Sequence, residues 1–469
     1  MRGTNLSALP FEVLHDILWR LDRNDLKSMR RVSRYHGGAA TTILYNTIHI
    51  SPNVRSIGRA LKIALRQDLA AHVRNIVYHV GLIEAVYTKE AFIAEVTKVT
   101  YNLPPQQVDW DARTERMYRC YLDETAAQEI FAELDEHQEL SSLMSNFNHL
   151  TSIATVRDEY DPFSPPQGYI ESRTGLPAAG FYEGSAFASL FEATAHSELA
   201  SVHGDALSWD IFLGLNAQST TPVRLDRLHD LHLGLYNSEL HHYHDPVVVL
   251  PELRRFLRLC GNLEMLSLDL DEFPLARTEQ FLECVSREAL YKCHFPRLSC
   301  LKLRGLISFE ERLMRFLESH SKTLRALELA DLMVVRRSTV DNDVSAVMST
   351  YTLNDDRAEH QASIVSVFQK IHDLCKLDRA KVAGNFTNRY DEAWYVTETV
   401  QEGFVSRIQR FLCRQGPSPF PPWPRYQRMQ EASTANSRVT AEVGDSFELE
   451  PAAMQFCDET WEWCPELLV

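Results

Sequence analysis

One six-residue pattern, LxxLxL, occurs four times in the second half of the chain. The copies read LHDLHL at 228–233, LEMLSL at 263–268, LSCLKL at 298–303 and LRALEL at 324–329. They begin 35, 35 and 26 residues apart, and the pattern occurs nowhere else in the sequence. Such self-similarity predicts a repeated structural unit, in which each copy contributes a short strand with its leucines turned inward.

Amphipathic stretches lie between these copies. Their apolar residues have helical spacing and are Leu253, Phe256 and Leu257, then Leu282 and Val285, then Leu313, Phe316 and Leu317. A short strand followed by a helix cannot bury its apolar face alone, so we expect successive units to stack on one another. The alternative is an ordinary α/β sheet whose strands are rich in leucine. The recurrence of the leucine positions favours the stacked repeat.

Weaker signals flank this section. Val73, Ile76 and Tyr78, and likewise Leu150 and Ile153, could mark earlier strands of the same array. The runs 364–374 and 404–412 predict later helices, and the acidic segment 109–148 predicts a helix that packs against the array.

Composition limits the class of protein. The chain has 469 residues and a formal net charge of −16, which is the wrong sign for binding nucleic acid through its phosphates. No stretch approaches the roughly 18 apolar residues of a membrane span. Pro10, Glu12 and Asp16 interrupt the first twenty residues, so we expect no secretory signal. The nine cysteines contain no CxxC pair and are expected to be reduced, packed as small apolar groups.

The chain divides into seven segments by composition and periodicity. We expect a small helical domain at 5–50, mixed α/β structure with possible early repeats at 51–160, a long loop and connection at 161–224, the leucine-periodic repeats at 225–335, a loop or insertion at 336–360, helices at 361–414, and a disordered acidic tail at 415–469.

Residues 9–50 predict three short helices. Pro10 suits the first turn of a helix, in which Leu14, Ile17, Leu18 and Leu21 form one apolar stripe. Asp22 or Asn24 could cap a second helix, and Gly37-Gly38 predicts a break before a third. Three such helices make a very small core, so this segment needs a partner surface or the rest of the chain to pack against.

These residues also closely resemble an F-box. The matching elements are Leu9-Pro10-x-Glu12-Val13-Leu14-x-x-Ile17-Leu18, then Asp25-Leu26, then Arg31-Val32-Ser33-Arg34, then Leu44-Tyr45, in the family's order and spacing. The match covers about 40 residues, under a tenth of the chain. It departs from the family at Tyr35-His36, since an aromatic residue such as Trp often stands one position later. The leucine-periodic section resembles leucine-rich repeats of an irregular, longer kind, so the whole chain looks like a fungal-type F-box and leucine-rich-repeat protein.

The resemblance implies a specific set of partners. F-box segments dock on a Skp-type adaptor, which joins them to a cullin and a RING subunit in an SCF ubiquitin ligase. The consensus positions, some contacting the adaptor and others forming the small core, would be Leu9, Pro10, Val13, Leu14, Ile17, Leu18, Leu26, Val32, Ser33, Leu44 and Tyr45. The basic residues Arg30, Arg31 and Arg34 could steer the segment toward an acidic partner or could be merely a solvated surface.

No catalytic motif stands out, so we expect a protein that is not an enzyme and that uses no cofactor. The densest polar cluster is His229, His232, His241, His242 and His244, followed by Asp245. Such residues could hold zinc, but HHYHD reads as a loop, and exposed loop histidines are common. The sequence therefore predicts no metal site.

Three functions remain open at this stage. The resemblance favours the substrate-recognition subunit of an SCF ligase, with an F-box for the adaptor and repeats for a client protein of unknown identity. The second reading is a repeat scaffold with an F-box-like cap outside a ligase. The third is an enzyme whose active site is not marked by any recognisable sequence motif. In the first reading we expect a cytoplasmic or nuclear protein without membrane or nucleic-acid partners.

Overall fold

A computed structural model describes most of the chain, in two compact units, Met1–Ser238 and Glu239–Val469. The described residues are 9–83, 88–101, 112–156, 180–181, 186–194, 196–208, 211–213, 225–236, 246–270, 285–335, 364–387, 393–396 and 404–420. The boundary falls inside the leucine-periodic section, so the first LxxLxL copy belongs to unit 1 and the other three belong to unit 2.

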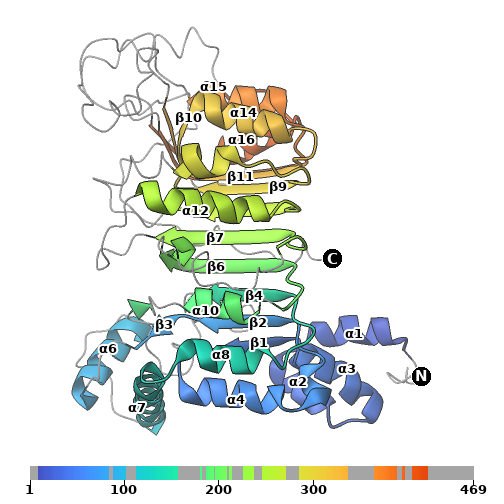
Figure 1. Cartoon of the computed structure of the whole chain (residues 1–469), viewed down its shortest axis with the longest axis vertical. Coiled ribbons are helices and arrows are strands. Elements are labelled where there is room, and N and C mark those ends of the chain that lie inside the picture. Colours follow the sequence, from blue (N-terminus) through green and yellow to red (C-terminus); the bar gives the residue numbers. More distant parts are fainter. Residues whose placement is uncertain are drawn as a thin grey trace. The chain divides into compact units, whose positions relative to one another are not determined.

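Unit 1 is a mixture of helices and strands (Figure 1). Its elements are α1 (Phe11–Trp19), α2 (Arg23–Met29), α3 (Arg34–Leu44), β1 (Thr47–Ile50), α4 (Val54–Ala64), α5 (Gln67–Ala70), β2 (Asn75–His79), β3 (Gly81–Leu82), α6 (Lys89–Tyr101), α7 (Ala112–Ala132), α8 (Glu136–Met144), β4 (Ser152–Val156), β5 (Gly180–Phe181), α10 (Ala186–Ala193), β6 (Ser201–Ser208) and β7 (Asp230–Tyr236).

Five strands of unit 1 pair in parallel in the order β1-β2-β4-β6-β7, while β3 pairs with β5 antiparallel. The register aligns equivalent positions of every strand: Ile48, Ile76, Ile153, Val202 and Leu231 form one continuous column. All five side chains are buried. The residue just before a strand also donates its backbone amide to the carbonyl of the residue just before the neighbouring strand. Thr151 donates in this way to Arg74, and Ala200 donates to Thr151.

Unit 2 repeats this arrangement. Its elements are α12 (Pro246–Leu259), β8 (Met265–Asp269), the π-helical turn η3 (Val285–Ala289), the 3-10 turn η4 (Leu290–Lys292), β9 (Cys300–Arg304), β10 (Ile307–Phe309), α14 (Glu310–His320), β11 (Ala326–Val335), α15 (Ile364–Leu374), β12 (Arg379–Thr387), β13 (Ala393–Val396) and α16 (Phe404–Leu412). Strands β8, β9, β11 and β12 are parallel, β10 pairs with β11 in parallel, and β13 adds to β12 antiparallel.

The predicted strand at each LxxLxL copy is confirmed. The last two leucines of each copy lie in β7, β8, β9 and β11, and the first lies just before the strand. In unit 2 the pairing aligns Leu266 with Leu301 and Leu327, and it aligns Leu268 with Leu303 and Leu329. All twelve leucines of the four copies are buried. The fold class is therefore α/β with mostly parallel strands, as the leucine periodicity indicates.

Several further expectations are also confirmed. Strands β2 and β4 occur at the two weaker signals, helices α7 and α8 lie within 109–148, and α15 and α16 match the predicted runs. The apolar residues of α12 and α14 named above are buried and complete the core of unit 2. Val285 lies in η3, whereas Leu282 lies outside the described residues.

Other expectations were wrong. The segment 161–224, taken as loop and connection, contains α10 and β6, and the segment 361–414, taken as helical, also contains β12 and β13. These strands were missed because they lack the leucine pattern: Gly204 occupies a column position of β6, where an added Cβ would meet the side chains of Phe187 and Leu207. The side chains of Leu207 and of Phe187 in α10 occupy the space that a leucine fills in β7.

Part of the segment that was expected to be a disordered tail is described by the structure. Residues 415–420 are described, and Phe420 is buried against the rings of Phe368 and Phe411. The expected insertion at 336–360 and the remaining tail at 421–469 lie outside the described residues. None of the helices in the described ranges combines the length and the apolarity that crossing a bilayer requires.

A buried polar network joins helices of unit 1. The Asn53 side chain caps α4 by accepting from the amide of Ser56 at 2.7 Å, and its Nδ2 donates to Glu124 Oε1 of α7 at 2.6 Å. Asn53 and Glu124 are both buried. Because an unsatisfied buried polar group is costly, this network fixes how α7 packs beside α4.

Gly384 in β12 is expected to tolerate no side chain. Its φ is +78°, and an added Cβ would overlap the carboxylate of Asp331, which pairs with Arg304 at 3.3 Å. We expect Gly384→Ala to destabilise unit 2 by about 1–2 kcal/mol or more, from backbone strain plus displacement of Asp331. Hydrogen exchange should then quicken in β11 and β12. Gly261→Ala is the matched control, since a Cβ there meets nothing within 4 Å; equal protection in both variants would contradict the prediction.

Candidate functional site

The three-helix segment α1–α3 begins each of its helices at a residue suited to that place. Pro10 precedes α1 as its N-cap residue. Asp22 caps α2 by accepting from the amides of Asn24 and Asp25, both at 2.8 Å, which confirms one of the two predicted caps. Ser33 caps α3 by accepting from the amide of His36. These caps satisfy amides that a short helix would otherwise leave without acceptors.

The predicted break at Gly37-Gly38 was wrong, because α3 runs through both glycines. Neither has a positive φ. An added Cβ at Gly37 would lie 2.9 Å from the carbonyl oxygen of Arg30. Gly37 therefore serves close packing of α3 against the end of α2 rather than a turn.

A small apolar core holds the three helices together. It consists of Leu14, Leu18, Leu26, Ala39 and Ala40, with Leu21, Met29, Ile43 and Leu44 packed against it. Around its edge, the Tyr45 hydroxyl accepts from Arg30 Nη1 at 3.0 Å, and the Arg30 guanidinium lies over the Tyr45 ring. Arg30 is thus engaged within the segment, whereas Arg31 and Arg34 are exposed.

Helix α1 is apolar on both sides of its buried stripe. Val13 and Ile17 lie on one side, and Phe11 and Trp19 lie on the other, where their rings flank that of His15. With Val32 and Tyr35, these are the exposed apolar residues of the segment, with exposed fractions between 39% and 63%. We call these six residues the exposed apolar set. Exposed apolar side chains of this size can form an interaction surface where they lie together, as Val13 and Ile17 do one turn apart on α1.

The consensus positions fall into three groups. Leu14, Leu18 and Leu26 are buried, Leu9, Leu44 and Tyr45 are half-buried, and Pro10, Val13, Ile17, Val32 and Ser33 are exposed. The predicted apolar stripe is therefore divided, since Ile17 is exposed. Sequence reasoning missed Phe11, Trp19 and Tyr35 as exposed apolar residues, although the i, i+4 spacing from Phe11 to His15 and Trp19 was a usable signal.

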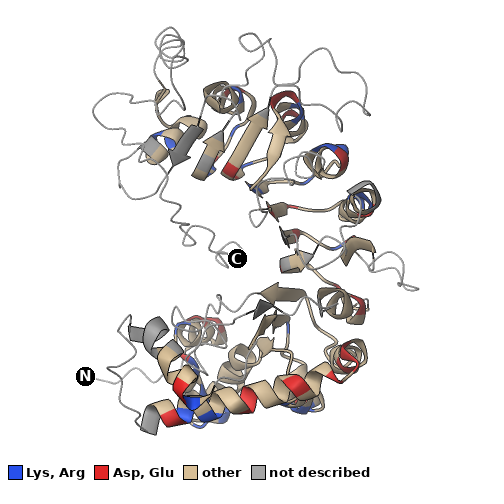
Figure 2. Cartoon of the chain, turned by 90° about the vertical axis from the view of Figure 1, so that its left-hand side faces the viewer, with Lys and Arg blue, Asp and Glu red and all other residues tan. Residues whose placement is uncertain are grey.

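The strands of both units present a second face, opposite the buried columns. Its central row comprises His49, Val77, Ala154, His203 and His232 in unit 1, and Ser267, Lys302, Glu328 and Lys381 in unit 2. Charged residues lie mainly on the helices, and the strands are mostly uncharged (Figure 2). The central row of unit 2 is an exception: Glu328 pairs with Lys302 at 3.2 Å and with Arg379 at 3.1 Å.

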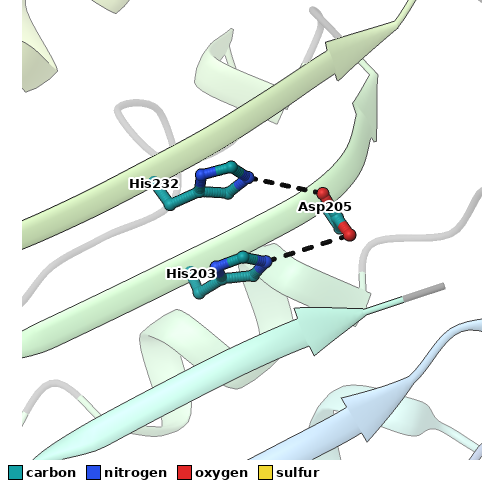
Figure 3. A group of neighbouring side chains, drawn as sticks. All are labelled: His203, Asp205 and His232. Carbon is teal, nitrogen blue, oxygen red and sulfur yellow. Dashed lines mark ion pairs between the residues drawn. The ribbon is translucent and has the colours of Figure 1, made fainter. Parts of the chain in front are cut away.

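In unit 1 two histidines of the central row lie beside an aspartate of β6, Asp205 (Figure 3). The imidazole rings of His203 and His232 are stacked, with centroids 4.0 Å apart and planes within 7°. Nε2 of His203 lies 3.8 Å from Oδ2 of Asp205, and Nε2 of His232 lies 3.5 Å from Oδ1. Burial acts to raise the pKa of Asp205, but its contacts with the two histidines outweigh burial and hold that pKa well below its usual range.

These three side chains are the residues that could hold a metal ion in the part of the chain that the structure describes. His232 therefore belongs with His203 and Asp205, and the other members of the predicted cluster at 241–245, His241, His242, His244 and Asp245, lie outside the described residues. His203 and Asp205 were missed because they stand almost 30 residues before His232 and in a segment taken as loop.

The cysteines that are described carry no disulfide. Cys260, Cys293, Cys300 and Cys375 are buried, as expected for thiols packed as small apolar groups, whereas Cys120 is exposed. Burial raises the pKa of Cys293 and of Cys375 to about 11, so both are protonated near neutral pH and are poor nucleophiles. The described geometry gives these thiols a packing role.

No protein-family model matches this chain, and no curated protein matches it. Any proposal for the function of this chain therefore rests on the arrangement of its residues.

Leu14 and Ile17 should differ sharply in their effect on stability. Leu14 is fully buried in the small core, so Leu14→Ala should destabilise the three-helix segment by about 2–5 kcal/mol. Ile17→Ala, on the exposed side of α1, should change its stability by no more than about 0.5 kcal/mol. Hydrogen exchange of α1–α3 in the full chain measures both, and similar protection in the two variants would contradict the division into core and surface.

Proposed function

We propose that this chain is the substrate-recognition subunit of an SCF-type ubiquitin ligase. Its N-terminal F-box would bind a Skp-type adaptor, and through it a cullin and a RING subunit. The observation that carries the proposal is the exposed apolar set on α1–α3, which includes three of the sequence positions that resemble an F-box, Val13, Ile17 and Val32. The chain would perform no chemistry itself and would contribute proximity and orientation of a client. Such a role would place it in the cytoplasm or the nucleus.

The adaptor would contact the exposed consensus positions. Val13 and Ile17 lie one helical turn apart on α1, and Val32 follows α2 with the largest exposure of the set. Apolar helices that lie against an apolar groove derive most of their affinity from a few such side chains at the centre of the interface. The buried residues Leu14, Leu18 and Leu26 would act indirectly, by holding that surface in shape. Arg31 and Arg34 would speed association with an acidic adaptor, an effect that salt weakens.

The client would bind the strands. We infer that the two units belong to an irregular leucine-rich-repeat array. The inference is supported by the in-register strands, by the repeated leucines and by the repeated backbone hydrogen bonds between residues that precede neighbouring strands. In such arrays the side chains opposite the buried columns are free to vary, since the scaffold does not depend on them. The half-buried central row of unit 1 is then the natural client surface, whereas Ser267, Lys302 and Glu328 in the row of unit 2 are buried.

Co-expression with a Skp-type adaptor tests the proposal. The full chain should co-purify with the adaptor, and Val13→Glu combined with Ile17→Glu should reduce capture at least about tenfold, because charges would enter an apolar interface. Both residues are exposed, so the free protein should remain folded by circular dichroism. Reconstitution with the cullin, the RING subunit and a ubiquitin-conjugating enzyme should then yield ubiquitin transfer to lysines of this chain itself.

Ile130→Glu is the matched control. Ile130 is an isoleucine of α7 in the same unit, exposed to 54% compared with 42% for Ile17. It should leave adaptor capture unchanged. If the soluble, folded wild-type chain does not capture the adaptor, the proposal is contradicted. That result would favour the alternative, a repeat scaffold whose F-box-like cap serves another assembly.

A further inference from the structure

Three potential ligands on two adjacent strands of unit 1 converge because of strand geometry alone. Successive side chains of a strand point to opposite faces, so His203 and Asp205 share a face of β6. The parallel register pairs His203 with His232 of β7 and thereby places the two imidazoles side by side. Both Nε2 atoms point toward the Asp205 carboxylate (Figure 3).

A bulge in β6 directs the carboxylate. The register shifts between Gly204 and Leu207, so that Asp205 and Ala206 stand opposite the single residue Gly234. Bulges of this kind re-aim a side chain and are frequent beside functional sites. Gly234 has no side chain, so the position next to Asp205 on β7 contributes no bulk to the space before the carboxylate.

The distances fit an ion between the groups better than direct hydrogen bonds. Nitrogen–oxygen hydrogen bonds span about 2.7–3.2 Å, and the two separations here are 3.5 and 3.8 Å. Two atoms that each lie about 2.0–2.2 Å from a tetrahedral metal ion are about 3.3–3.6 Å apart. Only a small adjustment of the side chains would therefore bring all three donors into the coordination sphere of one ion.

We propose that His203, Asp205 and His232 bind a divalent first-row transition-metal ion, with zinc as the reference case. Two neutral imidazoles and one carboxylate form the ligand set typical of zinc and non-haem iron sites, whereas calcium and magnesium prefer oxygen alone. The side chains are 12%, 34% and 17% exposed in that order, so solvent reaches the site and an ion can enter. Three protein ligands leave at least one coordination position for water or for a side chain of a partner.

A second histidine pair in unit 1 provides a contrast. His49 of β1 and His79 of β2 also stack, with ring centroids 5.2 Å apart. Their facing nitrogens, Nδ1 of His49 and Nε2 of His79, are 2.9 Å apart, which is the length of a direct hydrogen bond. The rings of His49 and His79 therefore face each other at hydrogen-bond distance, whereas the Nε2 atoms of His203 and His232 both face a carboxylate.

Zinc titration of the metal-stripped full chain tests the proposal. Isothermal calorimetry against a competing chelator should show one tight site in the wild type. His232→Gln and Asp205→Asn should each weaken it more than about 100-fold, since even loss of an outer-shell partner costs about 10–100-fold. The matched control His49→Gln should leave the affinity unchanged. Circular dichroism of the metal-free variants checks that they are folded.

Two further measurements separate this site from its rivals. The combined change of His241, His242 and His244 to Gln should leave tight binding intact; loss of binding there, with His232→Gln unaffected, would assign the zinc to those three histidines and overturn the proposal. X-ray absorption of the zinc-loaded wild type should show two imidazoles, oxygen ligands and no sulfur, and it needs no variant to fold. Absence of tight binding by the wild type would leave only an ion pair between Asp205 and the histidines and would overturn the proposal.

Discussion

The in-register parallel pairing of short strands is the constraint on which the rest of each unit depends. In each unit one buried apolar column runs unbroken through the paired strands, as with Ile76, Ile153 and Val202 in unit 1 and with Leu266, Leu301 and Leu327 in unit 2. A slip of one residue in the pairing would turn all the buried apolar side chains of a strand to the other face. The loss of that burial would cost so much free energy that the register is strongly fixed. The helices then have one apolar surface to cover, and their own buried stripes are matched to it.

This constraint explains which parts of the fold could be predicted from the sequence. Where the column residues are leucines, as in β7, β8, β9 and β11, the spacing alone identifies the strand. In β6 one column position is Gly204, and its space is filled by Leu207 of the same strand together with Phe187 of α10, so part of the compensation comes from a different element. In β12 the columns hold Ala380 and Val382. Local spacing cannot reveal such substitutions, because they depend on which helix packs against which strand.

The three-helix segment shows a similar limit. Its sequence indicates three helices and one of its caps correctly, and those features depend on neighbouring residues. Which apolar residues remain exposed depends on how α1 meets α3, and that packing turns Leu14 and Leu18 inward while Ile17 stays in water. Gly37 looks like a break in the sequence and instead permits the approach of α2 to α3. The same consensus therefore contains both a core and a surface, and only the packing distinguishes them.

The scaffold and the candidate binding positions alternate along the same strands. In each LxL triplet the outer residues build the columns, and the central residue faces away from them, as His232, Lys302 and Glu328 do. A change at a half-buried central position such as His232 leaves the columns intact, so such a position can acquire charge, a metal-binding side chain or an apolar group at little cost to the fold. Lys302 and Glu328 are buried and paired, so a change at either one would break their buried ion pair. The pairing register then decides which central residues become neighbours. His203 and His232 meet because the columns beside them are aligned, so the core of the unit determines the geometry of the cluster.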